Sequence, residues 1–358
     1  MVDINEDRVK NYTMDLKRAA RLETFSPNPW GRSMKTVISH GPKKKENRIY
    51  VKEYAGDKVI LEVEVNPKSD NRPLTAKVVH LSRHDFLVIG TYAAPYYNQK
   101  FWRKVGNFFR GNPWETQGQG IYIARFQYNG QKFIRFYNFT TFENFFEAYG
   151  KRQEKKIKRK AKRKKKRGKE LLLDFNLLLH DIIETDDEYL LVAESYIPEF
   201  RQENSSFDPL TGQIRGSGRR VFAGYRYTHA IVASFNKEDG TMNWDNSFPI
   251  WNVLSMNLKE RVQVSVDTAE NATLVYNYNG MLQSRTIEEG EVLEPRMIRP
   301  VRTEFASDRI KENFSGDLEY WYDRYFLAWG YQRITNTEAG IFSTDRQRRV
   351  LYLYKVGY

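Results

Sequence analysis

Hydrophobic and polar positions alternate at a period of two along most of this chain, and β-branched and aromatic residues fill the apolar positions. This pattern is typical of strands that bury one face. Residues 48–54 (RIYVKEY) and 58–65 (KVILEVEV) alternate on either side of Gly56 and Asp57, so they predict a hairpin. The sequence therefore predicts an all-β fold.

One segment recurs: a polar or acidic turn is followed by four or five apolar residues, a small residue and an aromatic residue. Its three copies are RHDFLVIGTY (83–92), TDDEYLLVAESY (185–196) and YDRYFLAWGY (322–331). Each copy precedes a second apolar strand, in 120–133, 229–244 and 349–356, and 262–284 supplies a further pair of strands. Five antiparallel units can be outlined, at roughly 45–66, 75–140, 172–250, 258–288 and 318–356.

A small twisted sheet cannot bury both faces by itself, so neighbouring units are expected to stack. The sequence predicts a β-propeller or propeller-like array of small antiparallel sheets, and the alternative is a pair of β-sandwiches. The expected division is an N-terminal polar segment (1–44), β units (45–140), a helical, strongly basic insertion (141–170) and further β units (171–358).

The basic insertion changes how the charge of the protein is interpreted. Fourteen of the twenty residues from Lys151 to Glu170 are Lys or Arg, and only Glu154 and Glu170 oppose them. The segment carries +12 of the formal net charge of +13, which leaves 44 basic and 43 acidic residues elsewhere. Any inference from charge to partner therefore depends on this segment alone.

The residues ahead of the tract predict a helix. The aromatic residues of TTFENFFEAYG fall at i, i+3, i+4 and i+7, which is one face of a helix, with Thr141 as its N-cap. Gly150 either ends this helix or is crossed at a cost of about 1 kcal/mol. If the helix continues to Arg167, Ile157 and Ala161 extend the apolar face and the arm is about 40 Å long.

Three functions are compatible with the tract: a solvated linker, adhesion to an anionic surface or acidic protein, and nonspecific binding of nucleic-acid phosphates. The tract has no aromatic residue to stack on bases, which disfavours nucleic acid. We therefore expect a non-enzymatic scaffold or interaction module that contacts an acidic partner or envelope surface, with nucleic-acid association as the alternative. The predicted contact residues are Lys155, Lys156, Lys158, Arg159, Lys160, Lys162, Arg163, Lys164, Lys165, Lys166 and Arg167.

Two smaller segments are candidate contact sites. Arg215, Arg219 and Arg220 share a Gly/Ser-rich loop whose amides could bind an anion, although an exposed connection between strands is the favoured explanation of this loop. The segment 98–115 mixes basic and aromatic residues and is a candidate surface or partner contact. Its aromatic residues are Phe101, Trp102, Phe108, Phe109 and Trp114.

Catalytic and metal-binding patterns are sparse, so no cofactor and no metal site are predicted. The chain has no Cys, and it contains no phosphate-binding loop or nucleophile-elbow motif. His80 and His84 are spaced i, i+4, but their segment predicts two strands around a turn. The acidic residues of 184–188 fit a turn, and the aromatic run Tyr320 to Tyr322 is expected in the core. An enzyme acting on glycans is a third possibility, because propellers host such activities.

Residues 234–248 (SFNKEDGTMNWDNSF) resemble quinoprotein-type propeller repeats, which implies a positive φ at Gly240 and packing of Trp244 between blades. The order of segments from about Lys77 to Tyr358 resembles uncharacterised exported propeller-like proteins of Bacteroidota-type bacteria. That resemblance implies a periplasmic or outer-membrane-associated protein. No apolar run long enough for a membrane span and no signal-peptide core occur in the sequence, so a cytoplasmic location is the alternative.

Overall fold

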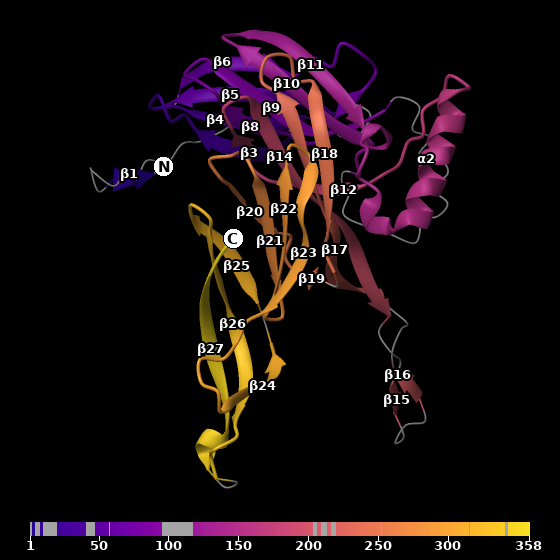
Figure 1. Ribbon diagram of the computed structural model, residues 1–358. Coiled ribbons are helices and arrows are strands. Elements are labelled where there is room, and N and C mark those ends of the chain that lie inside the picture. Colours follow the sequence, from indigo (N-terminus) through magenta and orange to yellow (C-terminus); the bar gives the residue numbers. More distant parts are fainter. Residues whose placement is uncertain are drawn as a thin grey trace. The chain divides into compact units, whose positions relative to one another are not determined.

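The computed structural model describes residues 2–3, 8–9, 20–40, 47–56, 58–94, 117–202, 206–208, 213–215, 220–251, 253–314, 316–340 and 343–358. These residues form seven sheets, five of them with four to six strands, and one α-helix (Figure 1). The fold is all-β, as the sequence predicts: the described residues form small antiparallel sheets with one basic helical insertion.

The first sheet has the order β3-β4-β5-β6, in which neighbours in sequence are neighbours in space. The predicted hairpin is present as β5 and β6, and Gly56 in its turn has φ 65. However, two of the four strands belong to the segment 1–44, so the β body begins earlier than the sequence suggests. The strands are β3 (Ala20–Pro27), β4 (Met34–His40), β5 (Arg48–Ala55) and β6 (Lys58–Glu64).

The second sheet has the order β11-β10-β9-β7, and β8 also pairs with β9. Its central strand β9 is buried at all nine positions, because it has neighbours on both edges and is covered on both faces. The strands are β7 (Arg72–Pro73), β8 (Lys77–His80), β9 (Asp85–Ala93), β10 (Gly120–Gln127) and β11 (Gly130–Asn138).

The third sheet has the order β12-β14-β17-β18, with β13 against β14 and β19 against β17. Its strands are β12 (Asn176–Leu179), β13 (Ile183–Glu184), β14 (Glu188–Gln202), β17 (Arg220–Asn236), β18 (Met242–Pro249) and β19 (Leu254–Ser255). Two separate two-stranded sheets comprise β1 (Val2–Asp3) with β2 (Arg8–Val9), and β15 (Ser206–Asp208) with β16 (Gln213–Arg215).

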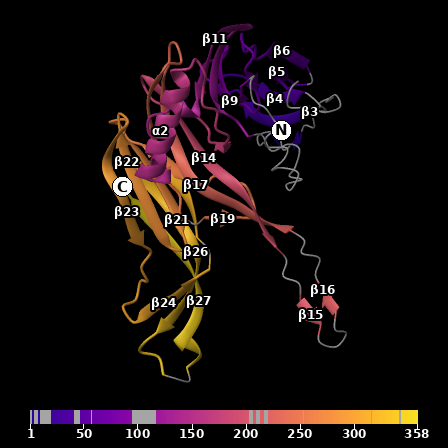
Figure 2. The same ribbon diagram turned by 90° about the vertical axis from the view of Figure 1, so that its right-hand side faces the viewer.

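The last two sheets each have four strands. One is the meander β20 (Gln263–Val266), β21 (Ala272–Tyr278), β22 (Met281–Glu288) and β23 (Glu291–Pro300). The other comprises β24 (Asp308–Asn313), β25 (Asp317–Tyr322), β26 (Tyr325–Asn336) and β27 (Gln347–Gly357). Figure 2 shows β26 and β27 running side by side, in a register that joins Tyr325 to Gly357.

The recurring segment forms a strand with three partners in each of three sheets: β9, β14 and β26. The apolar runs of β9 and β14 are buried at successive positions, so both faces of these strands are covered there, whereas β26 alternates between buried and more exposed positions. The five predicted units correspond to the five larger sheets, but the first unit omits the strands β3 and β4, the fourth omits β23 and the fifth omits β24.

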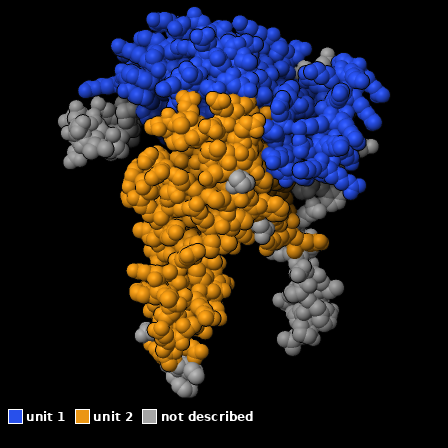
Figure 3. Space-filling model, in the orientation of Figure 1, with its two compact units in different colours: residues 1–192, 234–243 blue, residues 193–233, 244–358 orange. Residues whose placement is uncertain are grey.

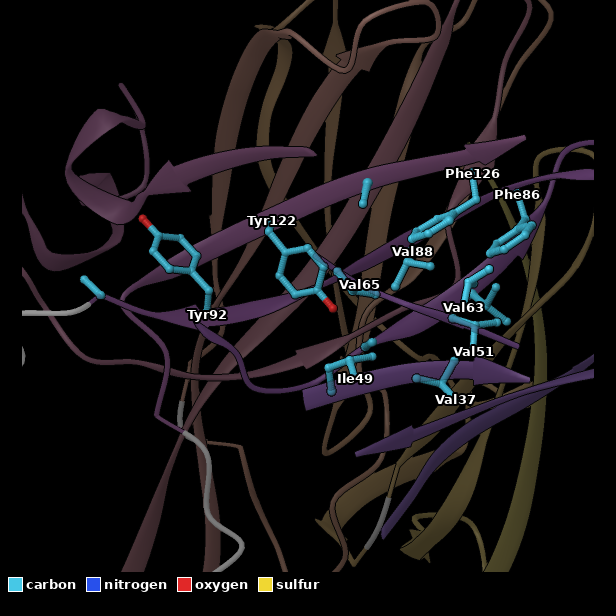
Figure 4. Close-up of a cluster of buried hydrophobic side chains, with 14 residues drawn as sticks. Val37, Ile49, Val51, Val63, Val65, Phe86, Val88, Tyr92, Tyr122 and Phe126 are labelled. Carbon is cyan, nitrogen blue, oxygen red and sulfur yellow. The ribbon is translucent and has the colours of Figure 1, made fainter. Parts of the chain in front are cut away.

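The chain divides into two compact units, coloured separately in Figure 3. Unit 1 comprises Met1–Val192 and Ser234–Asn243, and unit 2 comprises Ala193–Ala233 and Trp244–Tyr358. The core of unit 1 is built from the first two sheets, with side chains such as Val37, Val51, Phe86 and Tyr122 (Figure 4). Unit 2 has its own buried cluster around Phe326, which is 0% exposed.

The remaining described elements are helical. They are the short 3₁₀ turns η2 (Phe139–Thr141), η3 (Glu147–Tyr149) and η4 (Thr344–Arg346), and the α-helix α2 (Lys151–Lys165). No helix among the described residues is long and apolar enough to span a bilayer.

Candidate functional site

The basic insertion is helical, and the chain breaks at Gly150, which is one of the two outcomes that the sequence leaves open; a continuous helix from Thr141 to Arg167 does not form. Two 3₁₀ turns occupy its first part, and α2 starts only after Gly150. Gly150 has φ 84 and ψ 149, a conformation that ends one helical segment and redirects the chain before the next. The cap also differs: the Asn138 side chain accepts from the Thr140 amide, whereas Thr141 donates to the Asn138 carbonyl oxygen.

The aromatic residues ahead of α2 are gathered in a cluster that a straight helix would not allow. Phe145 lies at the centre, with ring centroids 4.9 Å from Phe139, 4.8 Å from Phe146 and 4.8 Å from Phe175. Phe139, Phe145 and Phe146 are almost completely buried. Phe175 comes from the segment that follows α2, so the cluster joins the chain before the helix to the chain after it. We call Phe139, Phe142, Phe145, Phe146, Tyr149 and Phe175 the aromatic anchor.

Hydrogen bonds hold the segment that follows the insertion to residues next to β9 and β10 of the second sheet. The amide of Phe175 donates to the Gly118 carbonyl oxygen, and the Gly118 amide donates back, each at 3.0 Å. The Gln119 side chain donates to Asp174, and its oxygen accepts from the Ala94 amide at 2.9 Å. The helix is therefore carried on a fixed base in unit 1.

The helix α2 presents one narrow half-buried stripe, and its other positions are exposed. Glu154, Ile157, Ala161 and Lys164 form the stripe, at the spacing of one helix face. Glu154, in the first turn, forms an ion pair with Lys158, and 2.5 Å separate Glu154 Oε1 from Lys158 Nζ. Ile157 and Ala161 are half-buried, but they do not extend a continuous aromatic face, because the helical segment breaks at Gly150.

The end of α2 is set by its sequence. Gly168 has φ 64, and the Lys169 amide donates to the Lys164 carbonyl oxygen at 3.0 Å, which is the bond of a Schellman cap. Four basic residues in the last turn complement the negative end of the helix dipole. These contributions offset the repulsion between like charges at i and i+4, which costs a few tenths of a kcal/mol per pair.

The structure gathers the predicted basic contact residues on one element, because Lys155 to Lys165 lie in α2 and Lys166 and Arg167 in the turn after it. Arg215 ends β16 and Arg220 begins β17, while Arg219 lies outside the described residues. The candidate contact residues Phe101, Trp102, Phe108, Phe109 and Trp114 also lie outside the described residues.

A second site, which the sequence did not indicate, is a pocket of about 440 Å³ within unit 1. Its walls come from the β3–β4 turn, β5, β6, the turn before β9 and the β10–β11 turn. They are lined by Asn28, Gly31, Arg32, Ser33, Lys35, Glu53, Ala55, Ile60, Leu61, Arg83, His84, Phe86, Tyr128 and Asn129. Residues more than ninety positions apart in the sequence meet here.

The floor of the pocket contains a buried ion pair between Lys35 Nζ and Glu53 Oε2, 2.9 Å apart. Glu53 also accepts hydrogen bonds from Ser33 and Asn28. Burial opposes its ionisation, but the hydrogen bonds from Ser33, Lys35 and Asn28 outweigh that penalty and lower the pKa of Glu53. Glu53 is therefore ionised and has its hydrogen-bonding capacity largely used.

His80 lies behind this pair, with Nδ1 3.4 Å from Lys35 Nζ and Nε2 3.2 Å from the Ser26 carbonyl oxygen. Burial, followed by the nearby Lys35 charge, lowers the pKa of His80, so the imidazole stays neutral. His84 is exposed in the turn between β8 and β9. The sequence correctly places these two histidines around a turn, and no group of three or more metal-ligating side chains occurs among the described residues.

The rim of the pocket carries an unusual backbone. Tyr128, in the two-residue turn between β10 and β11, has φ 55 although it is neither Gly nor Asn. Its side chain is 66% exposed, and its ring is stacked with that of His84 at a centroid separation of 5.4 Å. Only the tertiary structure shows that this exposed aromatic stack borders a pocket.

Three further segments that the sequence singles out lie in turns and at strand edges. The acidic residues of 184–188 form a turn in which the Thr185 amide donates to the Glu188 carbonyl oxygen at 3.1 Å, as predicted. The expectation of a buried aromatic run is wrong, because Tyr320, Trp321 and Tyr322 are 45%, 53% and 44% exposed at the edge strand β25. Gly240 has φ 71, and the backbone of Gly290 lies against the Trp244 side chain.

No protein-family model and no curated protein matches this chain. Among solved structures, it is similar to an ulvan lyase of a new polysaccharide lyase family, with 11% identity and a TM-score of 0.35 over 91% of this chain and 62% of the lyase. It thus spans less than two thirds of the lyase's length.

Two other solved structures show similarity of the same order. The subtype N11 neuraminidase-like protein of A/flat-faced bat/Peru/033/2010 (H18N11) shares 8% identity, with a TM-score of 0.31 over 90% of this chain and 71% of that protein. The α-L-arabinofuranosidase PaAbf62A of Podospora anserina shares 9% identity, with a TM-score of 0.31 over 96% of this chain and 94% of that enzyme.

Proposed function

We propose that this protein is a non-enzymatic interaction module that contacts an acidic partner protein or an anionic envelope surface through helix α2. The observation that supports this most strongly is the combination of an exposed basic helix and a rigid base beneath it. The helix has eleven Lys or Arg and one Glu among its fifteen residues, and none of its side chains is fully buried.

The geometry concentrates this charge. Fifteen residues at 1.5 Å each make a rod of about 22 Å, so roughly one net positive charge occurs every 2 Å. A juxtamembrane Lys or Arg contributes about 1 kcal/mol to attraction by an anionic lipid surface, so even part of this helix provides substantial affinity. The effect falls steeply with salt, because the charges are solvent-exposed.

The aromatic anchor supports the same function. A charged arm that is disordered when free must lose conformational entropy when it binds. Here the cluster around Phe145 and the backbone bonds between Phe175 and Gly118 hold the helix in place beforehand. A solvated linker would gain nothing from such an anchor, so the anchor favours a contact function over a spacer.

The test compares two triple variants of the intact protein. Lys155→Gln/Arg159→Gln/Lys162→Gln removes three exposed charges from one side of α2, and Gln keeps the helix propensity. Lys58→Gln/Lys68→Gln/Lys132→Gln removes three exposed charges elsewhere in unit 1 and is the matched control. Both variants carry the same net charge.

Binding is measured to vesicles containing anionic lipid, to poly-glutamate and to random duplex DNA across a salt series. We expect the α2 variant to lose about a hundredfold in affinity for vesicles or poly-glutamate, and the control to lose far less. The nucleic-acid alternative would be supported instead if the protein bound only DNA. The slope of log K against log salt concentration should then become shallower by about 0.9 for each phosphate contact that the variant removes. Failure of the intact protein to bind any of the three, or equal losses in both variants, refutes the proposal.

A further inference from the structure

The pocket in unit 1 has a charge and a shape suited to a small ligand. Three cationic side chains, Arg32, Lys35 and Arg83, and one acidic side chain, Glu53, line it. Lys35 and Glu53 neutralise each other at the floor, so the net positive charge of the lining comes from the exposed residues Arg32 and Arg83. A volume of about 440 Å³ lies within the range of small-molecule sites.

The walls supply complementary apolar contacts. Ile60, Leu61 and Phe86 line the pocket, and the exposed ring of Tyr128 borders it. Guanidinium groups bind carboxylate and phosphate oxygens in pairs, whereas an exposed aromatic ring offers a flat face for a ring-shaped ligand. The lining therefore fits a ligand that has an anionic group on one side and a ring on the other.

The backbone of Tyr128 holds its ring at the rim of the pocket. A two-residue hairpin turn with positive φ at its first position favours Gly, and a bulky residue there costs about 1–2 kcal/mol. The same backbone conformation occurs at Lys68, Glu270, Glu289 and Asp323, so at Tyr128 it fixes the ring in place and does not by itself mark a ligand site. The Tyr128 amide donates to the His84 carbonyl oxygen at 2.7 Å, which fixes the strained residue and its ring at the pocket.

We propose that this pocket binds a ring-bearing organic anion of about monosaccharide size. Arg32 and Arg83 hold its carboxylate or phosphate group, and its ring lies against Tyr128 and the apolar wall. Asn28 and Ser33 serve chiefly to fix Glu53, since both donate to that carboxylate. The buried pair in turn holds the floor of the pocket in one conformation.

Binding to the intact protein is measured by calorimetry and by ligand-observed NMR with matched probes. Glucuronate and glucose 6-phosphate distinguish a carboxylate from a phosphate, and benzoate distinguishes an aromatic from a sugar ring. Glucose and inorganic phosphate are the controls that lack the charge or the ring. We expect at least one ring-bearing anion to bind tenfold or more tightly than both controls.

Variants then assign the site. Arg32→Gln/Arg83→Gln and Tyr128→Ala should each lower the affinity for the bound anion about tenfold or more, because a charge-assisted bond or a stacking contact is lost. Lys68→Gln/Lys132→Gln is the matched control, with two exposed charges removed outside the pocket. All of these side chains are exposed, so the melting temperature should change little.

Each result decides the proposal. It is overturned if none of the three ring-bearing anions binds in the millimolar range, if glucose or inorganic phosphate binds as tightly as they do, or if the pocket variants bind like the control. The triple variant of α2 should leave the affinity for the anion unchanged. The proposal for the pocket and the proposal for helix α2 can therefore be rejected independently.

Discussion

The amide of Tyr128 donates a hydrogen bond of 2.7 Å to the carbonyl oxygen of His84, and the rings of these two residues stack with centroids 5.4 Å apart. The β10–β11 turn and the turn before β9 are thereby fixed to each other at the rim of the pocket. Contacts of this kind offset the unfavourable φ of 55 at Tyr128.

Because Tyr128 has a positive φ, its Gly variant should be more stable than its Ala variant, which is the reverse of the usual order of stability. At an exposed site with ordinary backbone angles, Ala is more stable than Gly by about 0.5–1 kcal/mol. At positive φ the Cβ atom is unfavourable, so Tyr128→Gly should be more stable to urea than Tyr128→Ala by about 1 kcal/mol. Equal stability of the two variants, or the usual order, would show that this turn is not strained.

Breaking the ion pair between Lys35 and Glu53 should be strongly destabilising. Lys35→Met leaves the Glu53 carboxylate buried without its cation, which costs about 3–5 kcal/mol of the free energy of unfolding. The double variant Lys35→Met/Glu53→Leu removes both charges and should recover a large part of this loss. Urea unfolding of Lys35→Met, Glu53→Leu and the double variant measures the coupling energy between the two side chains. If the double variant loses as much free energy of unfolding as the two single variants together, the prediction is wrong.

Because His229 in β17 is buried, the folded protein should become less stable in acid. It is 0% exposed, and burial lowers its pKa to about 3. In the unfolded chain the imidazole takes up a proton near pH 6.5, so between pH 6.5 and 3 the unfolded state binds more protons than the folded state. Folding stability should therefore fall as the pH falls through this window, by up to about 1.4 kcal/mol per pH unit.

The measurement is urea unfolding between pH 7 and 4. The His229→Gln protein should show a shallower slope over this range even if its stability at pH 7 is lower, because it lacks the titrating group. His80, whose pKa is also lowered, contributes in the same direction in both proteins and cancels from the comparison. An unchanged slope would mean that His229 titrates normally in the folded protein.

The aromatic anchor should protect the backbone amides of helix α2 from hydrogen exchange. Phe145→Ala removes the central ring of the cluster and should cost about 3–5 kcal/mol locally. Hydrogen exchange of 151–165 should then accelerate markedly. Phe126→Ala is the matched control, because Phe126 is equally buried in unit 1 but belongs to the core beside Phe86. If both variants affect the helix alike, the anchor has no specific role.

Local sequence was sufficient to predict most strands. The apolar runs of β9, β14 and β26 and the alternation of β5 were visible because side chains alternate between the two faces of a strand. The strands β3, β4, β23 and β24 lie outside the units that the sequence outlines, although β4 is buried at five successive positions. The polar residues Lys35, Thr36 and Ser39 interrupt its apolar pattern, and only their partners elsewhere make their burial tolerable.

In the insertion, the helical spacing of the aromatic residues does not correspond to one continuous helix. Phe142, Phe145, Phe146 and Tyr149 have helical spacing, yet they pack around Phe139 and Phe175 in successive turns. Helical spacing indicates a shared face only if the backbone is continuous. Here a better-packed aromatic cluster, together with Gly150, favours a break.

The sequence by itself determined the all-β character, the central strands, the single basic helix and its solvent exposure, because strand periodicity and charge density are local properties. The tertiary structure decided that the helix has an anchored base, that Lys35 and Glu53 are partners, and that Arg32, Arg83 and Tyr128 line one pocket. These relationships join residues far apart in the chain. They depend on strand register and turn geometry, which place side chains together whatever their separation in the sequence.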